Sequence, residues 1–180
     1  MRVSSYKVHR LCVVKSDPQY KETIERMKLS HIHPLMALWS FQTLHSTLSK
    51  FQILQVLDLE SCKDLSFKNQ CVEKICDMHQ LKYLSLWRAD IEKVPKEIGR
   101  LEYLQVLDMR DTNILTLPPL LRSLAHLLVG RKSNRVGLTL IERITKLTAL
   151  QTICGVEICG CSPNASRRRG KQGLRNLKRK

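Results

Sequence analysis

Aromatic residues are scarce in this 180-residue chain, at 5% of the sequence, and glycine and proline number only 7 and 6. That scarcity argues against an aromatic-rich β-sandwich and against low-complexity linkers. Hydrophobic residues nevertheless make up 43% of the sequence, which is more than an intrinsically disordered chain carries. The chain must therefore form a core, and that core must be mainly aliphatic, with leucine as its main component.

Long apolar runs are missing as well. No stretch approaches the roughly 18 consecutive apolar residues of a membrane span, and the charged N-terminal segment is not followed by the apolar run of a secretory signal. We therefore expect an intracellular protein in the cytoplasm, with the nucleus or the periphery of the plasma membrane as further locations. In that compartment the 7 cysteines, an odd number, are expected to be reduced.

Motifs for catalysis or cofactor binding are absent from the sequence. It contains neither the phosphate-binding pattern GxxxxGK[ST] nor a strand–turn–helix nucleophile motif. We expect no enzymatic activity and no cofactor. We expect no metal site either, because the spacing of the histidines and cysteines does not match that of structural zinc ligands. These residues are His31, His33, Cys71, Cys76, Cys159 and Cys161.

A repeat with a period of about 23 residues organises most of the chain, and such a period is typical of a repeat architecture. Leu81, Leu84 and Leu86 recur one period later as Leu104, Leu107 and Met109. With small changes of length, the same phase extends in both directions. The pattern predicts seven units, opening at Val8, Ile32, Leu54, Leu81, Leu104, Leu127 and Leu150.

Each unit combines two periodicities. Apolar residues at positions 1, 4 and 6 predict a short strand, and the later spacing of three and four, as in Val94, Ile98 and Leu101, predicts a short helix or 3₁₀ turn. One unit cannot bury its own apolar face, whereas stacked units can. We therefore predict an α/β solenoid, curved like part of a horseshoe, with parallel strands on the concave side and helical turns on the convex side. Leu57, Leu84 and Leu107 are expected to lie side by side.

The repeat units resemble leucine-rich repeats. The segments LQVLDLESC (54–62), LKYLSLWRADIEKVPKEIGRLEYLQVLDMRDTNILTLPPLLRSLAHL (81–127) and LTALQTICGVE (147–157) are similar to the repeat region of plant intracellular nucleotide-binding, leucine-rich-repeat disease-resistance receptors of the coiled-coil type. The resemblance covers about residues 6–157. It implies an interaction module of innate immunity that recognises a pathogen effector or a host protein, or holds the receptor's nucleotide-binding domain inactive. ATP or ADP is expected only in that separate domain of a full-length relative.

Other interpretations stay open from the sequence. An intracellular leucine-rich-repeat scaffold of the Ras-signalling group has similar Leu-Pro units. Residues 158–180 form a basic segment that carries eight Lys and Arg and no acid, including Arg167, Arg168, Arg169 and Lys171. Such a segment could bind nucleic acid or an anionic surface, although it has no aromatic residue for stacking on bases. Solvated disorder of this segment is the simpler expectation. The predicted organisation is therefore a lead-in at residues 1–7, repeats at 8–157 and a basic segment at 158–180.

The concave side holds the candidate binding residues. Residues between the leucine positions of a strand point away from the core, because successive side chains alternate. The candidates are Asp58, Glu60, Tyr83, Trp87, Arg88, Asp108, Arg110 and Asp111. Tryptophan and arginine are enriched among the residues that dominate interface energetics, so Trp87 is the main candidate. A water-facing ladder in which Arg88 only pairs with Asp111 is the alternative.

The two ends of the array lack a recognisable polar cap. Solenoids need such caps to cover the apolar surface of the terminal units. Nothing before Val8 or after Val156 has that pattern. We therefore expect exposed apolar edges and a sequence that forms part of a longer array.

Overall fold

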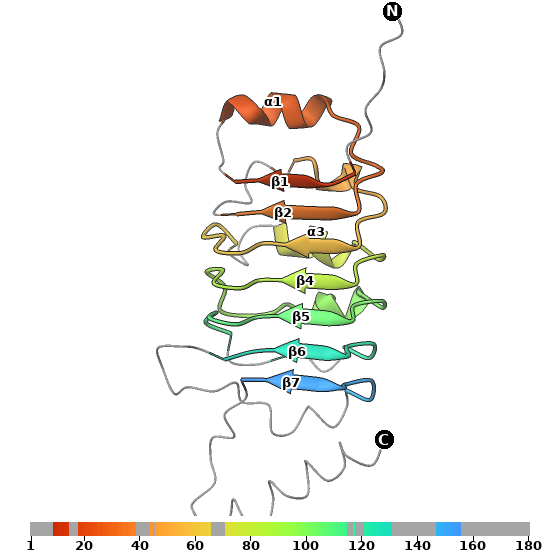
Figure 1. Cartoon of the computed structure of the whole chain (residues 1–180), viewed down its shortest axis with the longest axis vertical. Helices are drawn as coiled ribbons and strands as arrows, with labels where there is room; N and C mark the ends of the chain where they lie inside the picture. The colour runs from red at the N-terminus through yellow and green to blue at the C-terminus, as the bar shows by residue number, and fades with distance from the viewer. Residues whose placement is uncertain are drawn as a thin grey trace, which may run out of the picture.

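The structure is a computed structural model that describes residues 9–14, 18–38, 44, 46–65, 71–114, 117, 121–130 and 147–155. Short strands stack in chain order within this part and form one seven-stranded sheet (Figure 1). They are β1 (Leu11–Val13), β2 (Pro34–Ala37), β3 (Val56–Asp58), β4 (Tyr83–Ser85), β5 (Val106–Asp108), β6 (His126–Leu128) and β7 (Thr152–Cys154). Every neighbouring pair is parallel, so the chain crosses back outside the sheet after each strand. The predicted solenoid is confirmed.

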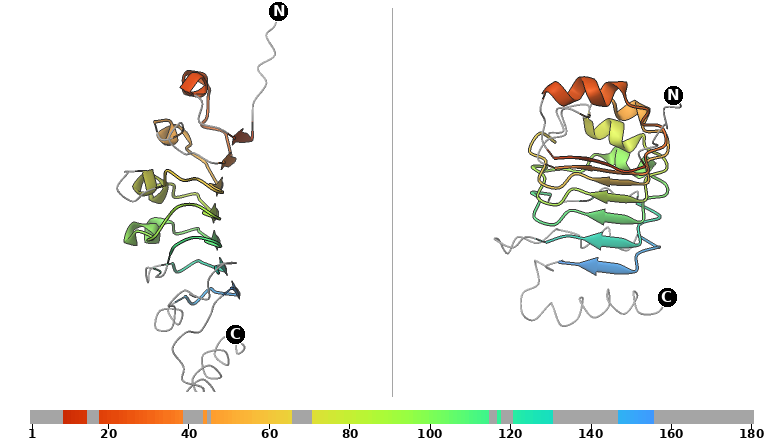
Figure 2. Two further views of the ribbon diagram at one scale, coloured as in Figure 1. Left: turned by 90° about the vertical axis from the view of Figure 1, so that its left-hand side faces the viewer. Right: turned by 45° about the horizontal axis from the view of Figure 1, so that its top comes forward.

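Helical segments lie on the side opposite the strands (Figure 2). They are α1 (Pro18–Arg26), η1 (Leu48–Lys50), α3 (Cys71–Cys76) and η2 (Lys96–Arg100). In the best-patterned unit, Pro95 precedes η2 with a φ of −65°, the value that its ring favours at the start of a helix. Ile98 and Leu101, spaced by three residues, turn into the core. The predicted convex turns are therefore present.

One aliphatic row runs through the whole sheet. Its members lie within each strand and pair in register from one end to the other. They are Leu11, Leu35, Leu57, Leu84, Leu107, Leu127 and Ile153. Leu35, Leu57, Leu107 and Leu127 have no exposed surface. The predicted neighbours Leu57, Leu84 and Leu107 lie side by side, which confirms the stacking on which the solenoid depends.

The repeat that contains β6 is out of phase with the prediction. Leu107 pairs with Leu127, and Leu127 pairs with Ile153. The stretch of sequence from Leu107 to Leu127 is therefore shorter than the period, and the stretch from Leu127 to Ile153 is longer than the period by the same number of residues. A constant period opens this unit at Leu127 and puts Gly130 in the aliphatic row, where it offers no side chain. The unit opens at Leu124 instead, and Leu124 and Leu127 take the two buried positions. Register follows burial, and the chain outside the strands absorbs the change of length.

Few polar side chains are buried in this core, and Thr112 is one of them. Thr112 and Cys62 occupy equivalent positions in their units, after β5 and β3. The Thr112 hydroxyl donates to the Met109 carbonyl at 2.8 Å, and the Cys62 thiol donates to the Ala37 carbonyl at 3.2 Å. Each of these buried polar atoms is therefore satisfied by a backbone carbonyl.

Two parts of the predicted organisation lie outside the described residues. These are the lead-in 1–7 and the basic segment 158–180 with Arg167, Arg168, Arg169 and Lys171. Among the residues that the structure does describe, no helix has both the length and the apolar character needed to cross a membrane.

Candidate functional site

Three central strands end in the same hydrogen-bonded turn. The side chain of the last strand residue accepts a bond from the backbone N–H two positions later. The pairs are Glu60 N and Asp58 Oδ1 at 3.2 Å, Trp87 N and Ser85 Oγ at 3.5 Å, and Arg110 N and Asp108 Oδ1 at 3.1 Å. Asp and Ser favour such turns because their short side chains reach the backbone. The turn fixes Glu60, Trp87 and Arg110 at equivalent places on neighbouring strands.

The next residue of each turn has a left-handed backbone. The φ angle is 58° at Ser61, 55° at Arg88 and 55° at Asp111, a region that residues other than glycine seldom enter. Backbone hydrogen bonds to the next repeat stabilise this conformation. The Ser61 N–H donates to the Trp87 carbonyl at 2.8 Å, and the Arg88 N–H donates to the Arg110 carbonyl at 3.0 Å. The same geometry holds Arg88 and Asp111 beside Trp87.

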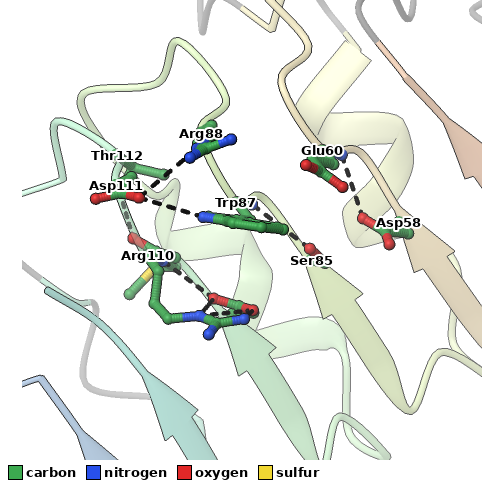
Figure 3. Close-up of polar contacts among 10 residues, drawn as sticks. Asp58, Glu60, Ser85, Trp87, Arg88, Arg110, Asp111 and Thr112 are labelled. Carbon is green, nitrogen blue, oxygen red and sulfur yellow. Dashed lines mark hydrogen bonds and ion pairs between the residues drawn. The ribbon is translucent and has the colours of Figure 1, made fainter. Parts of the chain in front are cut away.

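Trp87 lies at the centre of a group of charged side chains (Figure 3). Its ring centroid is 4.8 Å from the guanidinium carbon of Arg88 and 5.3 Å from that of Arg110. The indole N–H donates to Asp111 Oδ2 at 3.3 Å, and the same oxygen lies 3.7 Å from Arg88 Nε. Each cation–π contact at an exposed site contributes about 0.5–1 kcal/mol. The ring is half-buried, so it is oriented by its neighbours and still reachable by a partner.

Arg110 covers a buried carboxylate. Its Nε lies 3.0 Å from Asp108 Oδ1, and its Nη2 lies 2.6 Å from Asp108 Oδ2. Asp108 is only 1% exposed, and Ser85, at the equivalent place on β4, is 2% exposed. The hydrogen bond to Asp108 raises the pKa of Arg110 above its ordinary value. Both residues lie between core positions of their strands, so the alternation directs them to the concave side, and other side chains bury them there.

Tyr83, Asp58 and Glu60 form the remaining part of the surface. Tyr83 pairs in register with Val56 and Val106, and its partial burial raises the pKa of its phenol. Asp58 and Glu60 are half-buried on the β3 side of Trp87. The structure therefore groups Trp87, Arg88, Asp108, Arg110 and Asp111 through direct contacts and places the other three candidates alongside. We call all eight residues together the concave cluster.

An apolar extension of this surface was not among the predicted binding residues. Val14, which directly follows β1, is 54% exposed, and Met36, which lies within β2, is 39% exposed. The signal was available, because Met36 stands between core positions of β2, where Asp58 and Ser85 stand in later units. Val14 stands after β1, at the position that Glu60 and Trp87 occupy in later units. They were overlooked because apolar residues in a strand are ordinarily assigned to the core.

Histidines and cysteines stay dispersed. Within the described ranges, no group of three His, Cys, Asp or Glu side chains is placed to hold a metal ion. His31 makes an edge contact with His9, with ring centroids 5.7 Å apart. The Cys71 side chain, Cys159 and Cys161 lie outside the described part of the chain.

We predict that two buried cysteines resist alkylation. Burial raises the pKa of the Cys62 and Cys76 thiols to about 12, so at pH 8 almost none of either thiol is the reactive thiolate. Cys12 and Cys154 are exposed and are expected to react first with iodoacetamide, as peptide mass spectrometry can show. Burial of the two thiols also makes stability depend on pH. The unfolded thiols ionise near pH 9 and the folded ones only near pH 12, so the free energy of unfolding is expected to fall as the pH rises from about 9 to 12. Equal labelling of all four cysteines in the native chain would contradict the prediction.

Comparison with known families agrees with this geometry. The family model described as a leucine-rich repeat region matches residues 31–179. The chain belongs to this leucine-rich repeat family. The parallel strands, the aliphatic row and the convex turns of the repeat region agree with that membership.

Similar proteins of known role come from rice, Oryza sativa subsp. japonica. The repeat region is 34% identical over 149 residues to the disease resistance protein Pik-2, an alignment that covers 81% of this chain and 14% of that protein. It is 46% identical over 70 residues to the disease resistance protein RGA4, covering 39% of this chain and 7% of the relative. The predicted resemblance to plant resistance proteins is confirmed. The repeat region spans about 14% of the length of Pik-2.

Solved structures with the same architecture are more distant in sequence. An internalin from Listeria monocytogenes superposes with a TM-score of 0.58 at 18% identity, over 90% of this chain and 46% of that one. A leucine-rich repeat protein of Leptospira interrogans gives a TM-score of 0.54 at 21% identity, over 79% and 34% of the two chains. At these identities the comparison establishes the fold alone.

Proposed function

We propose that the repeat region is a protein-recognition module of a plant immune receptor and acts by binding, without catalysis of its own. Its partner is a pathogen effector, a host protein or the nucleotide-binding domain of the receptor. The rice relatives are disease resistance proteins, which supports the immune context. The receptor role places the module inside the plant cell.

One observation carries the proposal: a tryptophan held in a fixed orientation among charged side chains on the concave side of the sheet. Trp87 keeps part of its ring accessible while Arg88, Arg110 and Asp111 fix its position. A side chain that is already ordered loses little conformational entropy on binding. Tryptophan and arginine together are also the residues most enriched among those that dominate interface energetics.

The test compares two aromatic substitutions in a yeast two-hybrid screen with the full chain as bait. Trp87→Ala is expected to weaken partner binding at least about tenfold, as truncation of a central anchor does. Tyr103→Ala is the matched control, because Tyr103 is 55% exposed in the turn before β5 and lies outside the concave cluster. Titration of purified pairs gives the affinities. A screen that yields no protein partner would show that the proposed function is wrong, whereas partners that bind Trp87→Ala as well as the original chain would show that Trp87 is not the anchor.

A further inference from the structure

The N-terminal third of the concave sheet presents apolar side chains to solvent. Cys12 and Met36 pair in register on β1 and β2, and Val14 and Leu38 continue the two strands. In the described part of the chain, the exposed large hydrophobic residues are Val14, Ile53, Met36 and Tyr103, of which Val14 and Met36 belong to the sheet. Exposed apolar side chains that adjoin one another are typical of interaction surfaces. We call Cys12, Val14, Met36 and Leu38 the apolar patch.

Two carboxylates border this patch directly. Met36 pairs in register with Asp58. Glu60 lies in the turn that follows β3, at the position equivalent to Trp87 in the next repeat. Asp108 and Asp111 are compensated by Arg110 and Arg88. Asp58 and Glu60, in contrast, have no ion pair with any described cation. The negative charge left over on the concave side therefore lies where the apolar patch ends.

Distance and screening both allow an incoming cation at this border. Neighbouring strands lie about 4.8 Å apart, so a partner's apolar side chain on Met36 and a cationic one on Asp58 need stand only about 5 Å from each other. The net charge of +15 on the chain does not prevent this approach at physiological salt. The Debye length there is about 8 Å, so the nearby carboxylates outweigh cations farther away.

We propose that the apolar patch, Asp58 and Glu60 together bind a segment of another protein in which an aliphatic or aromatic side chain stands beside a lysine or arginine. The apolar side chain packs on Met36 and Val14, and the cation lies between Asp58 and Glu60. Trp87 then borders the cationic end of the segment. This inference rests on the proposed function and adds the chemistry of the partner.

The test uses a phage library of random peptides as probe, selected on the full chain. Selected peptides are expected to be enriched in Lys or Arg next to Leu, Ile or Phe. Asp58→Asn combined with Glu60→Gln keeps the size of both side chains and is expected to weaken the best peptide about tenfold. Met36→Gln is expected to weaken it about fivefold. Glu102→Gln, an exposed acid in the turn before β5, is the matched control and should change nothing.

Three results would overturn the inference. The first is enrichment of acidic peptides. The second is a peptide affinity that falls with Trp87→Ala but not with the Asp58 and Glu60 double variant, which leaves the proposed function standing. The third is selection that succeeds only after Arg167, Arg168 and Arg169 are replaced by serine, since the surface is then occupied by the chain's own basic segment. An affinity that responds to the double variant and to salt, but not to Trp87→Ala, supports the inference and counts against Trp87 as anchor.

Discussion

Replacement of Leu107 by alanine is expected to lower the free energy of unfolding by about 2–5 kcal/mol, the range for a buried leucine. Leu107 has no exposed surface and pairs with Leu84 on one side and Leu127 on the other. In a solenoid, stability is approximately a sum over repeats and the interfaces between neighbours. The substitution therefore weakens two interfaces at once. Urea denaturation followed by circular dichroism measures the effect as a lower midpoint.

Val106→Ala is the matched control for this prediction. Val106 precedes Leu107 in β5 but points to the concave side, where it is half-buried. Its truncation should cost less than about 1 kcal/mol, because the side chain is already partly hydrated and leaves no closed cavity. Equal losses for the two variants would show that the aliphatic row does not carry the stability of the sheet.

Removal of the Asp108 carboxylate is expected to cost about 2 kcal/mol, because hydrogen bonds to charged groups contribute about 1.5–3 kcal/mol. Asp108→Ala loses the bond from the Arg110 backbone N–H at 3.1 Å and the three side-chain contacts with Arg110 at 3.0, 3.1 and 2.6 Å. The lower part of the range applies, since the Arg110 side chain is 47% exposed and water can replace its partner. Urea denaturation again measures the loss.

Asp108→Ser separates the two contributions, because the preceding repeat already has this arrangement. On β4, Ser85 accepts the bond from the Trp87 N–H through its hydroxyl. The serine variant should therefore recover about 1 kcal/mol of the loss by closing the turn again. The difference in unfolding free energy that remains between the serine variant and the original chain is the contribution of the ion pair, and it should become smaller at high salt. Equal stability of the alanine and serine variants would contradict the role of the turn.

The fold could be predicted from the sequence wherever the period is regular. Leu57, Leu84 and Leu107 recur at nearly constant spacing, and the structure places them side by side. Prediction was wrong at β6, where a short step is followed by a long one. A constant period cannot reveal such a pair of compensating changes. Burial decides the register, and only the three-dimensional stack shows that Leu127 belongs beside Leu107.

The candidate site was predictable in outline only. Alternation along the strands was enough to place Trp87 and Arg110 on the concave side. It could not show that Arg110 would cover Asp108, because that contact depends on the direction of a long side chain across its own turn. Alternation also places Met36, between the buried Leu35 and Ala37, on the concave side, but its exposure could be known only from the structure.

The unequal repeat lengths around β6 have a consequence for evolution. Insertions and deletions are accommodated in the crossing segments, while the paired strands keep their alignment. The side chains between core positions, such as Glu60 and Trp87, touch solvent and a few neighbours. Selection can therefore exchange these side chains one at a time without dismantling the scaffold beneath. A molecule built in this way can acquire new binding specificities and still fold as its ancestor did.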